Sequence, residues 1–73
     1  MTTFYQYMMA FRDDKPQDNR SRLANWMYDD HHFPKHAEQY DEISRYIETY
    51  SPFLNALTTF DEVWEEYRLI HHD

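Results

Sequence analysis

The residues of this chain that could hold a metal ion are histidines that lie next to acidic residues. His31, His32 and His36 lie next to the pair Asp29-Asp30, and imidazole with carboxylate is a ligand set for divalent metals. His32 and His36 are four residues apart, as on one helix face, but Pro34 lies between them and interrupts helical hydrogen bonding. We therefore expect a turn here, with His31 capping a helix end or bonding to the backbone, and no metal site.

Two pairs of adjacent acids, Asp29-Asp30 and Glu65-Glu66, are the candidates for acid–base catalysis. Neighbouring residues on a helix project about 100° apart, so neither pair converges on one substrate atom. The run His71-His72-Asp73 is expected to fray. The sequence has no glycine, and therefore none of the glycine-rich loops that cradle phosphates. We expect no catalytic residue, no cofactor and no enzymatic activity.

Positive charge gathers in one stretch, Arg12, Lys15, Arg20 and Arg22, which holds four of the seven basic residues. Such a cluster is a candidate for contacting nucleic-acid phosphates. Aspartates interleave with it, however, and fourteen acidic residues give the chain a net charge of −7, which repels phosphate. Nucleic-acid binding is therefore the alternative function. Pairing of the cluster with the acidic face of the last helix, within the molecule or on a neighbour, is equally open.

Aromatic side chains that flank the expected core face are the candidates for binding a protein. They are Tyr5, Trp26 and Tyr28, of residue types that are frequent at the energetic centres of interfaces. Burial in the core or at its rim is the competing explanation for all three. Opposite charge patches on one molecule also permit head-to-tail self-association. We expect a non-catalytic interaction module that binds protein in preference to nucleic acid.

These residues must be positioned by a small fold, since a chain of 73 residues allows one domain, 1–73. No apolar run is long enough to span a membrane, and no segment has the features of a signal peptide. We expect a soluble, unprocessed protein with no membrane partner. The chain has no cysteine and hence no disulfide, which suits a reducing cytoplasm.

Aromatic residues dominate the apolar content, with five Phe, seven Tyr and two Trp against eight Ile, Leu and Val. Because each aromatic ring buries a large area, a small chain can build a core from few of them. The absence of glycine disfavours tight β-hairpins and requires Asn, Asp or His wherever a helix ends in the left-handed conformation. The composition therefore favours an all-α fold.

Helical spacing of apolar residues predicts the first helix, which carries Phe4, Tyr7, Met8 and Phe11 on one face behind a Thr3 cap. A second apolar stripe on the same helix, Tyr5 and Met9, favours a position at the centre of the bundle, with exposure of the stripe to a partner as the alternative. A loop over 12–17 follows it.

The second helix begins at Asp18 or Ser21 and ends near Asp30. A proline-containing turn over 31–35 comes next, in which Phe33 is expected to plug the core. The third helix has Asp41 as a candidate cap, unless it begins earlier. Its apolar face consists of Ile43, Tyr46, Ile47 and Tyr50.

Two capping signatures predict the last elements. Ser51-Pro52 resembles an N-cap followed by an N1 proline and predicts a short fourth helix with Phe53, Leu54 and Leu57. The run Thr59-Phe60-Asp61-Glu62 matches a capping box and predicts that the final helix begins at Thr59. The face of that helix consists of Phe60, Val63, Trp64, Tyr67 and Ile70.

Six segments occur in a fixed order along nearly the whole chain: Phe4-Tyr5-Gln6-Tyr7, Ala24-Asn25, Tyr28-Asp29-Asp30, Phe33-Pro34-Lys35, Tyr40-Asp41-Glu42-Ile43-Ser44 and Thr59-Phe60-Asp61-Glu62-Val63-Trp64. Together they resemble the YozE-like family of small bacterial proteins. The resemblance implies a helical fold similar to the sterile alpha motif (SAM), in low-GC Gram-positive bacteria, and no established activity, so no catalytic residue carries over. SAM folds elsewhere bind proteins, RNA or lipids. We expect a compact, SAM-like all-α bundle of four to five short helices.

Overall fold

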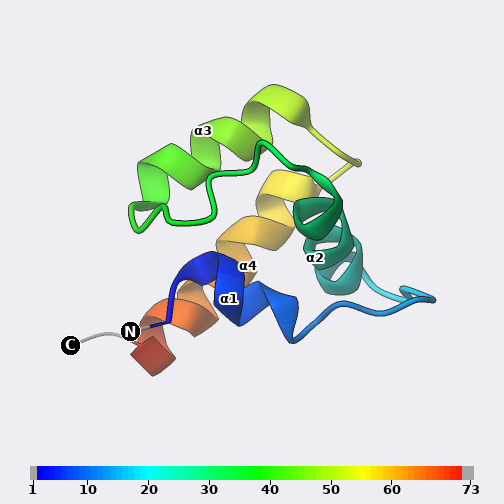
Figure 1. The fold of residues 1–73 in the computed structure, drawn as a ribbon, viewed down its shortest axis with the longest axis horizontal. Coiled ribbons are helices and arrows are strands. Elements are labelled where there is room, and N and C mark those ends of the chain that lie inside the picture. The colour runs from blue at the N-terminus through cyan, green and yellow to red at the C-terminus, as the bar shows by residue number, and fades with distance from the viewer. Residues whose placement is uncertain (1, 72–73) are drawn as a thin grey trace.

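The computed structural model describes residues 2–71, which form four helices and no strand. The helices are α1 (Phe4–Met9), α2 (Asn19–Asp29), α3 (Tyr40–Tyr50) and α4 (Ala56–His71). Figure 1 shows α1 beside the C-terminal half of α4, and α3 across the opposite end of the bundle. The second helix, α2, packs against both α1 and α4. The expected all-α bundle is confirmed. No helix in this part of the chain is long and apolar enough to cross a membrane.

The longest helix, α4, holds the bundle together, because it packs against each of the other three helices. Its 16 residues span about 24 Å, whereas α1 has 6 residues and packs against α2 and α4. The prediction that the first helix lies at the centre was therefore wrong. Phe11 lies beyond the end of α1, where its backbone N–H donates to the Met8 carbonyl.

The core is built from side chains of all four helices and of the turn after α2. Phe4 is fully buried, and its ring lies 5.2 Å from that of Phe60 and 5.3 Å from that of Trp64. Phe33 is 4% exposed, which confirms that it plugs the core from the turn. The other large side chains that are fully buried are Met8, Leu23, Met27, Ile43, Ile47, Phe60 and Val63.

The N-termini of α1 and α2 are capped as their sequence predicts. Thr3 and Gln6 form a reciprocal capping box, and the Asp18 side chain accepts a hydrogen bond from the Ser21 N–H. The third helix begins at Tyr40 behind Gln39, one residue before the candidate cap Asp41, which lies in the first turn. An acid there still favours the helix through its dipole.

The segment between α3 and α4 differs from its prediction. Ser51 is the C-cap of α3 with φ 38°, and Asn55 has φ 72°, so both adopt the left-handed conformation. No fourth short helix forms after Ser51-Pro52 in the structure, and α4 begins at Ala56. Thr59 is therefore inside α4, where its N–H donates to the Asn55 carbonyl at 2.9 Å and its side chain is buried. The capping box predicted at Thr59 was wrong, because the helix had already begun.

Candidate functional site

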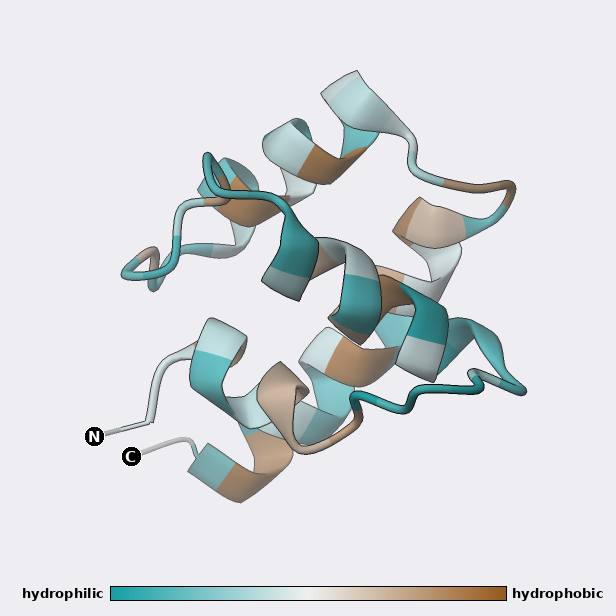
Figure 2. Cartoon of the chain, turned by 45° about the vertical axis from the view of Figure 1, so that its right-hand side comes forward, coloured by the Kyte–Doolittle hydropathy of each residue, from teal (hydrophilic) through white to brown (hydrophobic). Residues whose placement is uncertain are grey.

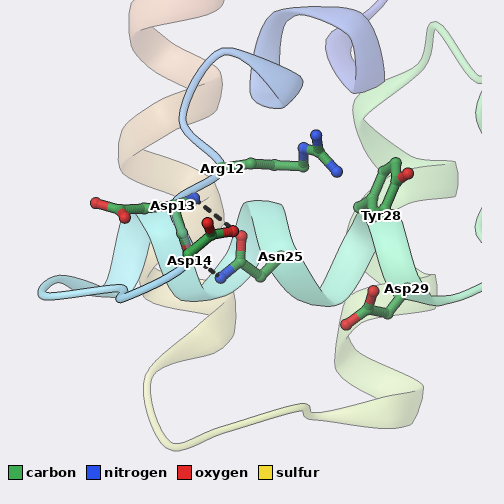
Figure 3. A pocket seen from close by; sticks show the side chains of 6 residues that line it. All are labelled: Arg12, Asp13, Asp14, Asn25, Tyr28 and Asp29. Atoms are coloured by element: carbon green, nitrogen blue, oxygen red, sulfur yellow. Dashed lines mark hydrogen bonds between the residues drawn. The ribbon is translucent and has the colours of Figure 1, made fainter.

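A shallow pocket of about 340 Å³ lies between the loop after α1 and the outer face of α2. Figure 3 shows the Arg12 side chain reaching from the loop across the pocket toward Tyr28 on α2. The residues that line it are Arg12, Asp13, Asp14, Asn25, Tyr28 and Asp29.

Asn25 fixes the loop on α2 by two hydrogen bonds to the backbone of Asp13. The Asp13 N–H donates to Asn25 Oδ1 at 3.2 Å, and Asn25 Nδ2 donates to the Asp13 carbonyl at 2.7 Å. The Asp13 carboxylate then accepts the Lys15 N–H at 3.0 Å, which closes a local turn. The backbone of Arg12 is thereby held next to α2 without a glycine in the loop.

Arg12 stacks on Tyr28 in this pocket. Its guanidinium carbon lies 3.7 Å from the centroid of the Tyr28 ring, and Tyr28 is 53% exposed. Within residues 2–71, no carboxylate lies at ion-pair distance from Arg12. Stacking occupies one face of the planar guanidinium, while its N–H edge is free to donate to an incoming carboxylate or phosphate.

A second cation and a second ring extend this surface. Lys35 Nζ, from the turn after α2, lies 5.8 Å from the centroid of the Tyr5 ring on α1. Burial raises the pKa of Tyr5, interaction with Tyr28 raises it further, and the nearby Arg12 charge opposes the rise. We name the four residues of these two cation–ring pairs the cation–aromatic face: Tyr5, Arg12, Tyr28 and Lys35.

Trp26, the third aromatic candidate, lies at the rim of the core. It is partly buried, and its ring centroid lies 5.8 Å from that of Phe33 and 6.0 Å from that of Tyr46. Trp26 therefore supports the packing of the turn 31–35 against α2 and α3. Tyr5 shares this place at the core rim, because it is partly buried and its ring centroid lies 5.8 Å from that of Phe33. Tyr28 is the exposed member of the three aromatic candidates.

The structure divides the predicted basic cluster among separate environments. Arg20 forms an ion pair with Glu66 of α4 at 2.5 Å and lies over the Phe11 ring at 4.9 Å. Arg22 donates to Asn19 at 3.4 Å, and Lys15 is exposed in the loop. Of the pairings that the sequence left open, Arg20 adopts the one with the last helix of its own molecule.

The histidine-containing turn is held by Asp30 and not by His31. One Asp30 carboxylate oxygen accepts the His32 N–H at 3.0 Å, and the other accepts the Tyr46 hydroxyl at 2.5 Å. In the part of the chain that the structure describes, no three histidine or acidic side chains converge to hold a metal ion.

The adjacent acids and the terminal histidine have structural contacts. Glu65 pairs with Arg68, and Glu66 with Arg20. His71 ends α4 with its ring centroid 5.1 Å from that of Tyr67, so the prediction that it frays was wrong. The predictions for His72 and Asp73 lie outside the described residues.

The sequence did not single out Lys35 of this face, nor the role of Asn25 in anchoring the loop beside it. The sequence did contain a hint of the role of Asn25. Its side-chain amide, on α2 next to the buried Ala24, can both donate to and accept hydrogen bonds from the backbone of a nearby loop. The sequence contained no such hint for Lys35, since its position over Tyr5 depends on how the turn folds back onto α1.

The comparisons with known proteins agree with this architecture. A UPF0346 protein of Bacillus velezensis is 47% identical over 73 residues, 99% of both chains. The UPF0346 protein YozE of Bacillus subtilis is 45% identical over 67 residues, 92% of this chain and 90% of its own. The UPF0346 protein YuiB of Lactococcus lactis is 48% identical over 65 residues, 89% of this chain and 94% of its own. No solved structure matches the chain. The family model described as YozE SAM-like fold matches residues 3–68, and the chain belongs to that family.

Proposed function

We propose that this protein is a non-catalytic interaction module of the bacterial cytoplasm, and that its cation–aromatic face binds an acidic segment of a partner protein. The observation that carries the proposal is the Arg12 guanidinium stacked 3.7 Å above the exposed Tyr28 ring. A stacked arginine loses little side-chain freedom when it binds, and its bidentate edge matches the geometry of a carboxylate.

The residue types on this face are those that contribute most to interface energies. Arginine and tyrosine are enriched among interface hot spots, and ordering of both side chains before binding lowers the entropy lost on association. Tyr5, Arg12, Tyr28 and Lys35 come from α1, α2 and two connecting segments, so only the folded chain presents them together.

The acids around the pocket restrict which anions fit. Asp13, Asp14 and Asp29 line the same pocket as Arg12, and they repel a ligand that carries charge along its whole length. A partner with one or two carboxylates at matching positions avoids that repulsion, whereas a nucleic-acid backbone does not. This negative rim supports protein over nucleic acid as the partner.

Nucleic-acid binding through the Arg12–Arg22 cluster is the second candidate. Exposed Lys15 and Arg22 favour it. The Arg20–Glu66 ion pair and the net charge of −7 weigh against it, since they neutralise one member of the cluster and repel phosphate.

Affinity capture from a bacterial lysate, with and without nuclease, tests both candidates. The bait is the wild type, Arg12→Gln or Tyr28→Ala. The matched controls are Arg45→Gln and Tyr50→Ala, which alter an exposed arginine and an exposed tyrosine on α3. We expect the wild type to capture a partner protein whether or not nuclease is added, with binding that weakens as salt increases. Both face variants should lose this partner, and both control variants should retain it. Equal capture by all five baits, or loss of every partner with nuclease, would overturn the proposal.

A further inference from the structure

The Arg12 pocket contains charges of both signs that do not pair with each other. Its lining includes one guanidinium and the three carboxylates of Asp13, Asp14 and Asp29. Within residues 2–71, no ion pair joins Arg12 to any of these acids, and its guanidinium lies 3.7 Å from the centroid of the Tyr28 ring instead. A ligand in this pocket therefore meets both positive and negative side chains.

Two of the three carboxylates remain open to a ligand. The Asp13 carboxylate already accepts the Lys15 N–H at 3.0 Å, and Figure 3 shows it pointing away from the pocket. The carboxylates of Asp14 and Asp29 lie below the Arg12 side chain in the same view. Both residues are exposed, and in the part of the chain that the structure describes neither takes part in an ion pair. These two acids can therefore receive a cationic group.

The pocket has little to offer an apolar ligand. Figure 2 shows the loop after α1, which forms one wall, as a continuous hydrophilic segment. The Tyr28 ring is the one aromatic surface in the lining, and Arg12 covers it. The volume of about 340 Å³ is near the lower end of the range for ligand sites. A site of this size and polarity fits the charged ends of a few side chains from a short segment.

The net charge of the whole chain also favours a ligand of mixed charge. The chain carries −7, so a segment that has only acidic residues is repelled before it reaches Arg12. A segment that has only basic residues meets the Arg12 guanidinium, which repels it at close range. A segment with one acid and one base avoids both penalties, because each of its charges finds the opposite charge in the pocket.

We propose that the partner segment bound at the Arg12 pocket carries a basic residue close to its acidic one. Its carboxylate binds the open edge of the Arg12 guanidinium, and its basic group binds Asp14 and Asp29. This inference rests on the proposed function and adds the charge pattern that the partner must have. The acid contributes most of the affinity, because a guanidinium holds a carboxylate by two hydrogen bonds. The base adds an exposed ion pair and selects against purely acidic segments.

Selection from a library of displayed random peptides, with the full chain as bait, tests this charge pattern. The baits are the wild type, Arg12→Gln and the double variant Asp14→Asn/Asp29→Asn. The matched control is Glu42→Gln/Glu48→Gln, which also removes two exposed acids, but from α3. All five substituted side chains are exposed, so we expect every bait to fold, and circular dichroism verifies this.

The wild type and the control should select peptides with an acid and a base within a few positions of each other. The double variant Asp14→Asn/Asp29→Asn should select the acid without the base, and Arg12→Gln should lose the preference for the acid. Fluorescence anisotropy then measures the affinity of a peptide that the wild type selects. Neutralising its acid should weaken binding at least about tenfold, and neutralising its base about two- to fivefold.

The outcomes separate this inference from the proposed function. A wild-type selection rich in acids but without bases would overturn the charge pattern and leave the proposed function standing. A preference for bases that Asp14→Asn/Asp29→Asn retains would do the same, since the base would then bind elsewhere. A selection that Arg12→Gln leaves unchanged, or the absence of any common pattern among the peptides, would contradict both.

Discussion

The hydroxyl of Tyr46 in α3 donates a hydrogen bond of 2.5 Å to the carboxylate of Asp30, which is the C-cap of α2. The second oxygen of the same carboxylate holds the His32 N–H at 3.0 Å. One acid thereby joins the end of α2, the turn that follows and α3. The turn carries Phe33 into the core and Lys35 to the ring of Tyr5, so this bond also positions part of the cation–aromatic face.

The Tyr46–Asp30 bond predicts a loss of stability at high pH. Burial, together with the bond to Asp30, raises the pKa of Tyr46 to about 12. A tyrosine in the unfolded chain titrates near pH 10, so the stabilisation is complete below about pH 10 and is lost as the pH rises to about 12. Urea denaturation measures the free energy of unfolding at about pH 8 and about pH 11. This free energy should be smaller at the higher pH in the wild type, and the difference, which is the slope with pH, should be reduced in Tyr46→Phe. A slope that Tyr50→Phe removes and Tyr46→Phe leaves intact would refute the assignment.

The same bond predicts sensitivity to acid. The hydrogen bond from Tyr46 lowers the pKa of Asp30, and the bond from the His32 N–H lowers it further. A lowered pKa means that the stabilisation is present above the carboxyl's ordinary pKa and is lost as the pH falls through the lowered value. The melting temperature should therefore fall less steeply in Tyr46→Phe than in the wild type as the pH is lowered below about 5. An unchanged acid profile would show that Tyr46 does not stabilise the carboxylate.

The capping box at Thr3 predicts a cost for removing its hydroxyl. Thr3→Ala frees the Gln6 N–H from its 3.2 Å hydrogen bond, and we expect a loss of about 1 kcal/mol in the free energy of unfolding. Thr58→Ala is the control, since Thr58 is exposed inside α4, where alanine favours the helix. Chemical denaturation measures both, and equal effects would show that Thr3 does not act as a cap.

Local patterns predicted the helix starts correctly where the capping residue lies outside any helical segment. Thr3 stands before the first helical pattern of the sequence, and Asp18 follows the loop 12–17, which has no helical periodicity. Thr59 has an equally good signature but is the fourth residue of α4, because the helix had already begun after the left-handed Asn55. A capping box inside a helix looks the same in sequence as one at its start.

The candidate site depended on contacts that local patterns do not contain. Arg12 and Tyr28 were each recognised from the sequence, but as members of different hypotheses, one for phosphates and one for proteins. Their stacking needs the loop to return to α2, which the two Asn25 hydrogen bonds achieve. Arg20, three positions before Leu23 in the same helix, meets Glu66 instead, because α4 crosses α2 there.

The left-handed conformation of Ser51 predicts that glycine will stabilise the protein at this position. Ser51 has φ 38°, a conformation that costs L-residues roughly 1–2 kcal/mol and glycine almost nothing. After allowance for the greater flexibility of unfolded glycine and for the loss of the bond from Ser51 Oγ to the Glu48 carbonyl, we expect a net gain of about 0.5–1 kcal/mol. Ser44→Gly, inside α3, should instead lose about 0.5–1 kcal/mol. Urea denaturation of the two variants checks the opposite signs, and destabilisation by both would argue against strain at Ser51.

The Arg20–Glu66 ion pair predicts how the basic cluster responds when its partner is removed. Both side chains are partly exposed, at 36% and 44%, so a double-mutant cycle with Arg20→Gln and Glu66→Gln should give a coupling of about 0.2–1 kcal/mol that falls with salt.

Glu66→Gln also releases the Arg20 charge, and a true phosphate-binding surface would then gain affinity. We expect no increase in binding of a single-stranded oligonucleotide, measured by fluorescence anisotropy at low salt, because Arg12 remains on Tyr28 and the aspartates of the pocket still repel phosphate. Tight binding by Glu66→Gln that Arg20→Gln removes would instead show that the ion pair masks a nucleic-acid site.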